Sequence, residues 1–265
     1  MRYRQLGFSL LELAIVIFIL GALLGAALTP LQIQFQMRAI RQTQAALDDT
    51  VAALYGFAVT ERRLPCPDLL VGGDGREDRL GPDACVFAEG GVPHVDLAIS
   101  GVDAWGHRLR YRVTAAETTP ATGANFVAVD DGVCQSGDGD FDLCAIGAIR
   151  VVTRGDDPAT ISLESKHQHQ LADQLPAVVI SHGPNGRAAV AMSAADLRDR
   201  PAPETDEAEN ADGDAVFVSR RNAAAQVACG DDEDETAPLC EFDDLVTWLS
   251  PAILNHLMVI SGQLP

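Results

Sequence analysis

The stretch that decides the fold is Gly7-Phe8-Ser9-Leu10-Leu11-Glu12, which leads into an apolar run from Leu13 to Leu28 and follows Arg2 and Arg4. A carboxylate near the centre of a membrane helix costs about 2.5–3.5 kcal/mol, so one at the head of such a run is a candidate functional residue. An ordinary secretory signal carries its cleavage site after the apolar run. Here the Gly-Phe pair comes before the run, which indicates another kind of signal.

The segment Gly7–Leu13 resembles the class III signal of type IV pilins and type II secretion pseudopilins. The resemblance implies that a prepilin peptidase cleaves between Gly7 and Phe8 and methylates the new amino terminus. It also implies that Glu12 meets the amino-terminal charge of a neighbouring subunit in a filament. Phe8 and Glu12 are four residues apart and share a helix face, and pairing the two charges would offset their desolvation. A plain signal anchor with an incidental Glu is the alternative.

Four regions are predicted: a leader (1–7), a transmembrane and assembly helix (8–30), its amphipathic continuation (31–60) and a disulfide-pinned periplasmic β-rich head (61–265). At about 1.5 Å per residue, the apolar run is about long enough to span a bilayer core. The continuation carries apolar residues at helical spacing, namely Ile33, Met37, Ile40, Leu47, Val51 and Leu54. We expect this stripe to pack on a sheet, with a short coiled-coil seam as the alternative.

Charge and cysteine content indicate the cellular location of the chain. The net charge of −19 argues against nucleic acid as a partner. Arg2 and Arg4 place the N-terminus in the cytoplasm, so we expect a single-pass inner-membrane protein whose head is periplasmic, or extracellular in an assembled filament. Six cysteines fit an oxidising compartment. Nearest-neighbour pairing is favoured, although other pairings stay open and zinc is disfavoured; the pairs would be Cys66–Cys85, Cys134–Cys144 and Cys229–Cys240.

The head is expected to be mainly β, which makes the fold class α+β and pilin-like. Strands are predicted from β-branched and aromatic content, at Arg108–Thr114, Phe126–Val129, Ala148–Thr153, Ala177–Ser181, Arg187–Met192 and Ala215–Arg220. The stretch 64–106 reads as a long loop, and 199–214 as a mobile acidic loop. Phe242–Ile260 has a helical pattern, in which Pro251 kinks the helix or starts a second one.

Two further segments resemble the major pseudopilin. Asp103–Tyr111 is similar to its Asp-x-Trp-Gly-Asn stretch, and Ile180–Gly186 to its Ser-x-Gly-x-Asp-Gly stretch. In that relative nearby residues hold calcium. The sequence Arg187–Val190 lacks the expected ligands, so that calcium site is not expected here.

No cofactor is predicted with certainty, but Ca²⁺ is a candidate at Asp138, Asp140 and Asp142. These alternating carboxylates begin like an EF-hand loop. Leu143 and Ile149 stand where that loop needs Gly and Glu, so only a looser calcium site or a solvated acidic turn remains. The acidic run 231–235 is expected to be solvated.

The sequence predicts no conventional enzyme. Ser181-His182 lacks the Gly-x-Ser-x-Gly elbow of a hydrolase, and adjacency in sequence does not place a nucleophile against a base. His167 and His169 lack further metal ligands. The favoured hypothesis is a minor pilin or pseudopilin whose partners are a prepilin peptidase, other subunits and an inner-membrane assembly machine. The alternatives are an anchored periplasmic binding or adhesive protein, and an anchored hydrolase that uses Ser181 and His182.

Overall fold

The computed structural model describes most of the chain in two units, 1–41 and 42–265, the second of which is called the C-terminal unit below. The described residues are 10–115, 125–129, 141–154, 169–190, 199–224, 229–234 and 237–264, with backbone only for 23–32. Helix α1 (Leu10–Glu61) runs through both units, so the long N-terminal helix that the sequence predicted is present.

The two parts of α1 have different surroundings. In the first part large apolar side chains are exposed, among them Leu10 at 89% and Phe18 at 77%. Among the described residues, no helix combines the length and apolar character needed to cross a membrane. In the second part Leu47 and Leu54 are fully buried. Because Ile33 is still 56% exposed, only the later half of the predicted apolar stripe lies in the core.

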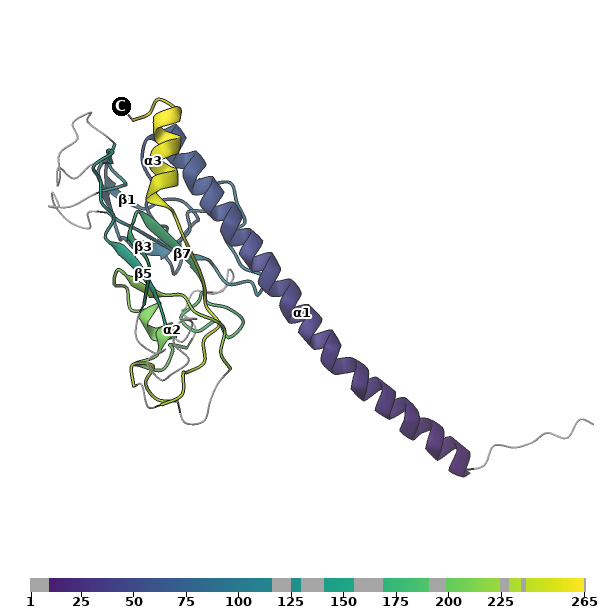
Figure 1. The fold of residues 1–265 in the computed structure, drawn as a ribbon. Coiled ribbons are helices and arrows are strands. Elements are labelled where there is room, and N and C mark those ends of the chain that lie inside the picture. Colours follow the sequence, from purple (N-terminus) through teal and green to yellow (C-terminus); the bar gives the residue numbers. More distant parts are fainter. Residues whose placement is uncertain are drawn as a thin grey trace, which may run out of the picture. The chain divides into compact units, whose positions relative to one another are not determined.

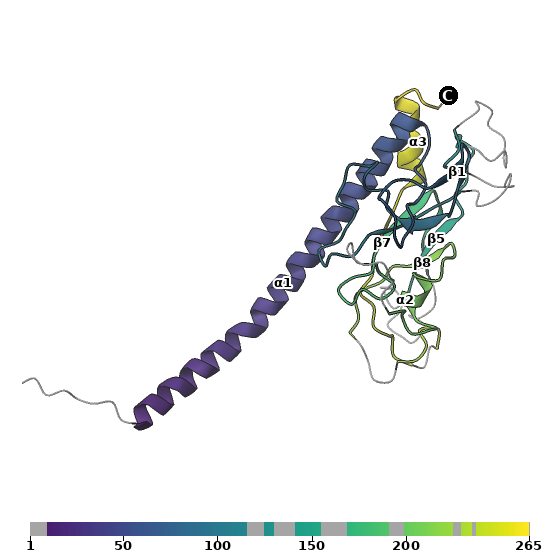
Figure 2. The same ribbon diagram turned by 180° about the vertical axis from the view of Figure 1, so that it is seen from behind.

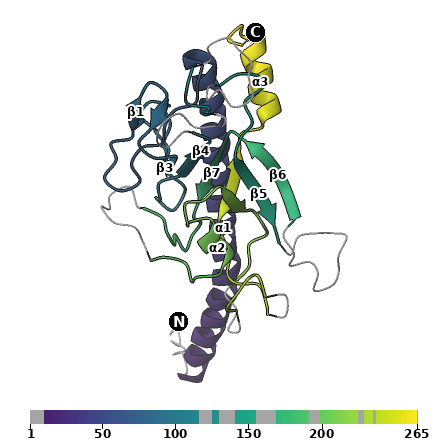
Figure 3. The ribbon, with the colours of Figure 1, turned by 90° about the vertical axis from the view of Figure 1, so that its left-hand side faces the viewer.

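The C-terminal unit is built on two main sheets and a short ribbon. The first sheet is antiparallel throughout, in the order β3 (Glu89–Gly91), β4 (Arg110–Val113), β7 (Ala177–Ser181) and β9 (Leu245–Trp248). In the second, β5 (Ile149–Thr153) lies between antiparallel β6 (His169–Leu175) and parallel β8 (Val216–Val218). The ribbon is β1 (Arg79–Gly81) with β2 (Ala84–Cys85). Figure 3 shows β5 and β6 side by side.

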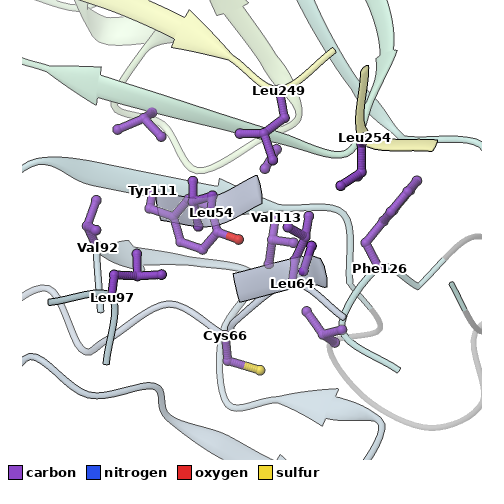
Figure 4. Packing of buried hydrophobic residues seen from close by; sticks show 14 of the residues in the cluster. Leu54, Leu64, Cys66, Val92, Leu97, Tyr111, Val113, Phe126, Leu249 and Leu254 are labelled. Atoms are coloured by element: carbon purple, nitrogen blue, oxygen red, sulfur yellow. The ribbon is translucent and has the colours of Figure 1, made fainter. Parts of the chain in front are cut away.

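Strand β7 is buried on both faces, which explains its continuous apolar sequence. Ala177 and Val179 belong to the core cluster that contains Leu54 of α1. The alternate residues Val178 and Ile180 belong to a second cluster with the strands of the other sheet. Figure 4 shows Leu54 in the first cluster with Tyr111, Leu249 and Leu254. The first sheet is therefore a middle layer, with α1 on one face and the second sheet on the other.

Two short helices complete the C-terminal unit. Helix α3 (Pro251–Ile260) lies beside the C-terminal end of α1 (Figure 1) and buries Leu254 and Met258. Helix α2 (Asp206–Glu209) lies near β8 (Figure 2). The α+β class, the long helix on antiparallel strands and the C-terminal helix are thus confirmed.

The predicted helix over 242–260 was wrong in its first part. Residues Leu245–Trp248 form β9, because they pair with β7 from Val178↔Trp248 to Ser181↔Leu245. A regular helix begins only at Pro251, whose fixed φ suits a first helical turn. Of the two interpretations of Pro251, the start of a helix is the one that holds.

Other departures from the predicted strands have local causes. Phe126–Val129 forms a turn, in which Asn125 Oδ1 accepts from Val127 N at 3.3 Å and Phe126 packs on the Phe141 ring. In 187–190 Ala188 has a φ of 61°, which breaks an extended strand; 191 and 192 lie outside the described residues. The predicted loop 64–106 contains the three short strands β1, β2 and β3.

Candidate functional sites

The predicted processing site can be placed only in part. Gly7 and Phe8 lie outside the described residues. Glu12 lies in the first turn of α1, among the exposed apolar side chains Leu10, Leu11 and Leu13. The structure therefore surrounds this carboxylate with the apolar surface that the sequence indicated.

Two of the three nearest-neighbour disulfides are present. Cys66 is bonded to Cys85, which pins the segment after α1 to β2, and Cys229 is bonded to Cys240. Cys144 is also disulfide-bonded; Cys134, its predicted partner, lies outside the described residues.

The predicted calcium loop cannot be assembled from the described residues. Asp138 and Asp140 lie outside them. Asp142 is 3% exposed, and its Oδ1 accepts a hydrogen bond of 2.6 Å from Cys144 N, as in a local turn.

A buried ion network makes the segment 199–214 an ordered part of the fold, so its prediction as a mobile loop was wrong. Asp206 Oδ1 accepts from Arg154 Nε at 2.8 Å, and its Oδ2 accepts from Arg220 Nε at 2.5 Å. Asp232 accepts from Asp206 N at 2.8 Å and from Cys240 N at 2.7 Å. Because Asp232 is 1% exposed, the prediction of a solvated run over 231–235 was also wrong at this residue.

Ser181 and His182 are both buried, and each bonds to a different carboxylate. Ser181 Oγ donates to Asp103 Oδ2 at 2.8 Å. The His182 Nδ1 atom lies 3.3 Å from Asp244 Oδ1. Burial alone would raise the pKa of Asp103, but hydrogen bonds from His107 and Ser181 lower it overall. Asp103 is thus a charged anchor for the turn 103–107, where the backbone N–H groups of Trp105 and His107 also bond to its Oδ1. The Ser181 hydroxyl is therefore bonded to the carboxylate that holds this turn.

A second carboxylate cluster was not predicted from the sequence. Glu207, Asp243 and Asp244 are 1%, 8% and 4% exposed, and each offers an oxygen that lies within 4.8 Å of the others. They are the only three such residues grouped closely enough to hold a metal ion within the described ranges. The sequence signal for this cluster was the acidic pair Asp243-Asp244 just before β9. No local sequence pattern relates that pair to Glu207.

The electrostatics of this cluster are unfavourable for three negative charges. Burial raises the pKa of Asp243 to about 7, helped by the charges of Glu207, Asp244 and Glu241 against one hydrogen bond from Asn185. Burial also raises the pKa of Glu207, and the neighbouring Asp244 raises it further. A cation or a proton in the cluster would relieve this repulsion.

Comparison with known protein families finds a match at the N-terminal end of the chain. Residues 2–28 match the prokaryotic N-terminal methylation motif. This motif is the class III prepilin signal that is typical of type IV pilins and type II secretion pseudopilins, and it implies processing by a prepilin peptidase. Comparisons with curated proteins and with solved structures give no match.

Proposed function

We propose that this protein is a minor pilin or pseudopilin, assembled into a filament by a type IV pilus or type II secretion machine. The observation that carries the proposal is the methylation motif at 2–28. In this proposal the peptidase removes residues 1–7, the helix from Phe8 onward anchors the subunit in the inner membrane, and the head, which the C-terminal unit forms together with its end of α1, lies in the periplasm. The role is mechanical, so no catalytic residue is required.

The exposed apolar side chains of α1 support a role in assembly. Leu10, Leu11, Ile17 and Phe18 are 61–89% exposed, far more than a soluble helix leaves open to water. Such a surface is suited first to lipid and then to the helices of neighbouring subunits. Glu12 would carry its charge into that apolar bundle, where the methylated amino terminus of the next subunit pairs with it. Contacts of this head-to-tail kind generate open filaments.

The disulfides Cys66–Cys85 and Cys229–Cys240 of the C-terminal unit fit the proposed compartment. Disulfides persist in the periplasm and on the cell surface and are rare in the cytoplasm. The Cys66–Cys85 disulfide joins the segment just after α1 to β2. The helix is therefore connected to the strands by a covalent bond as well as by packing in the core. A subunit that is pulled out of a membrane by its helix would profit from such a link.

The test is a Glu12→Ala variant produced together with the prepilin peptidase and the assembly machine. We expect normal cleavage, seen as loss of residues 1–7 and gain of one methyl group in the intact mass, but little incorporation into sheared filaments. Glu61→Ala, an exposed carboxylate at the other end of α1, is the matched control and should assemble normally. Normal incorporation of Glu12→Ala would contradict the role of Glu12. An uncut wild-type chain would favour the anchored binding or adhesive protein instead.

A further inference from the structure

Helix α3 carries apolar side chains on both of its sides. Leu254 and Met258 are fully buried in the core cluster that contains Leu54 of α1. On the opposite side of the helix, Ile253 and Ile260 are 52% and 65% exposed. A helix at the surface of a globular protein normally has polar or charged residues on its outward side, whereas a helix that is apolar all round is normally buried. The outward side of α3 therefore has the composition of a buried surface.

Five exposed residues form this outer face of α3, within an arc of about 120° at 3.6 residues per turn; they are Ala252, Ile253, His256, Val259 and Ile260. Four of the five are apolar, and none is Asp, Glu, Lys or Arg. The two longest stretches of the chain without any of these four residue types are 13–37, in α1, and 245–265, which contains α3. The outer face of α3 thus has the same charge-free, aliphatic chemistry as the first part of α1.

Two hydrogen bonds fix the direction of α3 against the end of α1. Just before α3, Ser250 N donates to the Tyr55 hydroxyl at 2.8 Å. Just after α3, Gln263 Oε1 accepts from Arg62 Nε at 2.6 Å. Because both contacts follow the chain in the same order, the two helices run in the same direction (Figure 1). The outer face is therefore a preformed surface that lies along the last turns of α1.

The size of the outer face limits what can cover it. Ten helical residues at about 1.5 Å each, on a helix about 10 Å wide, give a footprint of about 150 Å². A stable interface between two proteins buries about 1,200–2,000 Å². Two copies that met only through α3 would fall far short of that area, and the net charge of −19 on each chain would repel the other. The face is suited to one contact among the several that a subunit makes.

We propose that the outer face of α3 binds the uncharged aliphatic helix of a neighbouring filament subunit, of the kind that this chain carries at 13–37. The inference rests on the filament role proposed above, and it names the surface that receives such a helix. In that stretch Ile17 and Phe18 are 61% and 77% exposed, so both partners offer apolar surface. Their contact removes this surface from water and buries no unpaired charge. Because α3 runs along α1, the bound helix also lies beside α1, as head-to-tail stacking of subunits requires.

The test measures how well an Ile260→Gln variant is incorporated into sheared filaments. The change makes the outer face more polar and keeps a good helix former. Because the site is exposed, we expect normal cleavage and a Tm within about 2 °C of the wild type. Incorporation should fall at least about fivefold, because burial of one aliphatic side chain changes an equilibrium constant about tenfold or more. Combination with Ile253→Gln should lower it further.

Leu80→Gln is the matched control, because Leu80 is 66% exposed but lies in β1 rather than in α3. We expect this variant to assemble normally. Equal losses in Leu80→Gln and Ile260→Gln would show a general need for apolar surface, and normal assembly of Ile260→Gln with Ile253→Gln would show that α3 makes no contact; either result overturns the proposal. A wild type that does not enter filaments would overturn the proposed filament role, and this inference with it.

Photo-crosslinking in assembled filaments identifies the occupant. A photo-reactive amino acid in place of Ile260 should crosslink to the apolar N-terminal helix of a neighbouring subunit, and peptide mass spectrometry locates the crosslinked residue. The same amino acid in place of Leu80 should not reach that helix. Crosslinks from position 260 to lipid or to the head of a neighbour, or no crosslink at all, would contradict the proposed occupant.

Discussion

Replacement of Asp206 by Asn tests whether buried charge orders the segment 199–214. Asp206 is 1% exposed and joins two guanidiniums, those of Arg154 and Arg220, whose side chains are 7% and 1% exposed. Arg220 also stacks 4.5 Å from the centroid of the Phe242 ring, so it cannot turn to solvent without breaking that contact. The Asn side chain keeps the shape of Asp but removes the negative charge that the two buried guanidiniums share.

The loss comes mainly from these guanidiniums, which keep only weaker partners: Arg220 retains Asp232 at 3.5 Å, and Arg154 retains the exposed Glu233 at 3.2 Å. Burial raises the pKa of Asp206 in spite of the charges of Arg220 and Arg154, so the intact pairs offset only part of the desolvation of this carboxylate. Removal of one partner from a buried pair nevertheless costs about 3–5 kcal/mol, because the remaining charge stays buried. For a unit of this size each kcal/mol lowers Tm by about 2–4 °C, so we expect a decrease of about 6–20 °C.

Glu233→Gln is the matched control, because Glu233 contacts the same Arg154 at 3.2 Å but its side chain is 72% exposed. An exposed pair contributes about 0–1 kcal/mol, so Tm should fall by only a few degrees at most. Thermal unfolding of both purified variants, followed by far-UV circular dichroism, compares the two. If Asp206→Asn is no more destabilising than Glu233→Gln, the argument that burial decides the contribution of these pairs is refuted.

Two further predictions concern the core and a partly buried ion pair. Leu54→Ala should destabilise the C-terminal unit by about 2–5 kcal/mol, because Leu54 is fully buried between α1 and the first sheet; Ile33→Ala, at a 56% exposed site on the same helix, should change stability by less than about 0.5 kcal/mol in urea unfolding. Glu77→Gln should cost about 1.5–3 kcal/mol at pH 7, because Glu77 accepts from Arg63 at 2.6 and 2.7 Å. Burial alone would raise the pKa of Glu77, but the bonds from Arg63 and Cys66 N and the charge of Arg79 lower it below its ordinary 4.5. A lowered pKa contributes stability above pH 4.5 that is lost as the pH falls through the folded-state value, so the difference between wild type and variant should shrink in acid; a difference that stays constant from pH 7 to pH 3 would contradict this assignment.

The features that the sequence determined by itself are those with a local physical cause. An uninterrupted apolar run after a Gly-Phe pair specifies the methylation motif, and helical spacing of apolar residues specifies α1. Strand β7 was predicted with its observed bounds, Ala177–Ser181, because a strand buried on both faces has a continuous β-branched sequence. Helix α3 begins at Pro251, which the sequence offered as a possible start.

Tertiary structure decided the elements whose reason lies far away in the chain. Leu245–Trp248 has the apolar spacing of a helix, yet it is a strand because the edge of β7 was available for pairing. His169–Leu175 is polar and exposed at most positions, and it is a strand because it pairs with β5. Local propensity is a weak preference, which such pairing overrides.

The charged clusters follow the same division. The acidic composition of 199–214 indicates solvation, whereas Arg154 and Arg220, from outside that segment, supply positive charge that offsets part of the desolvation of buried Asp206. Similarly, Glu207 lies 36 residues before Asp243, and their contact exists because the β7–β9 pairing brings the two segments together. Sequence spacing reports the groups that share one helix or one strand, whereas a buried charge depends on partners that only the folded chain supplies.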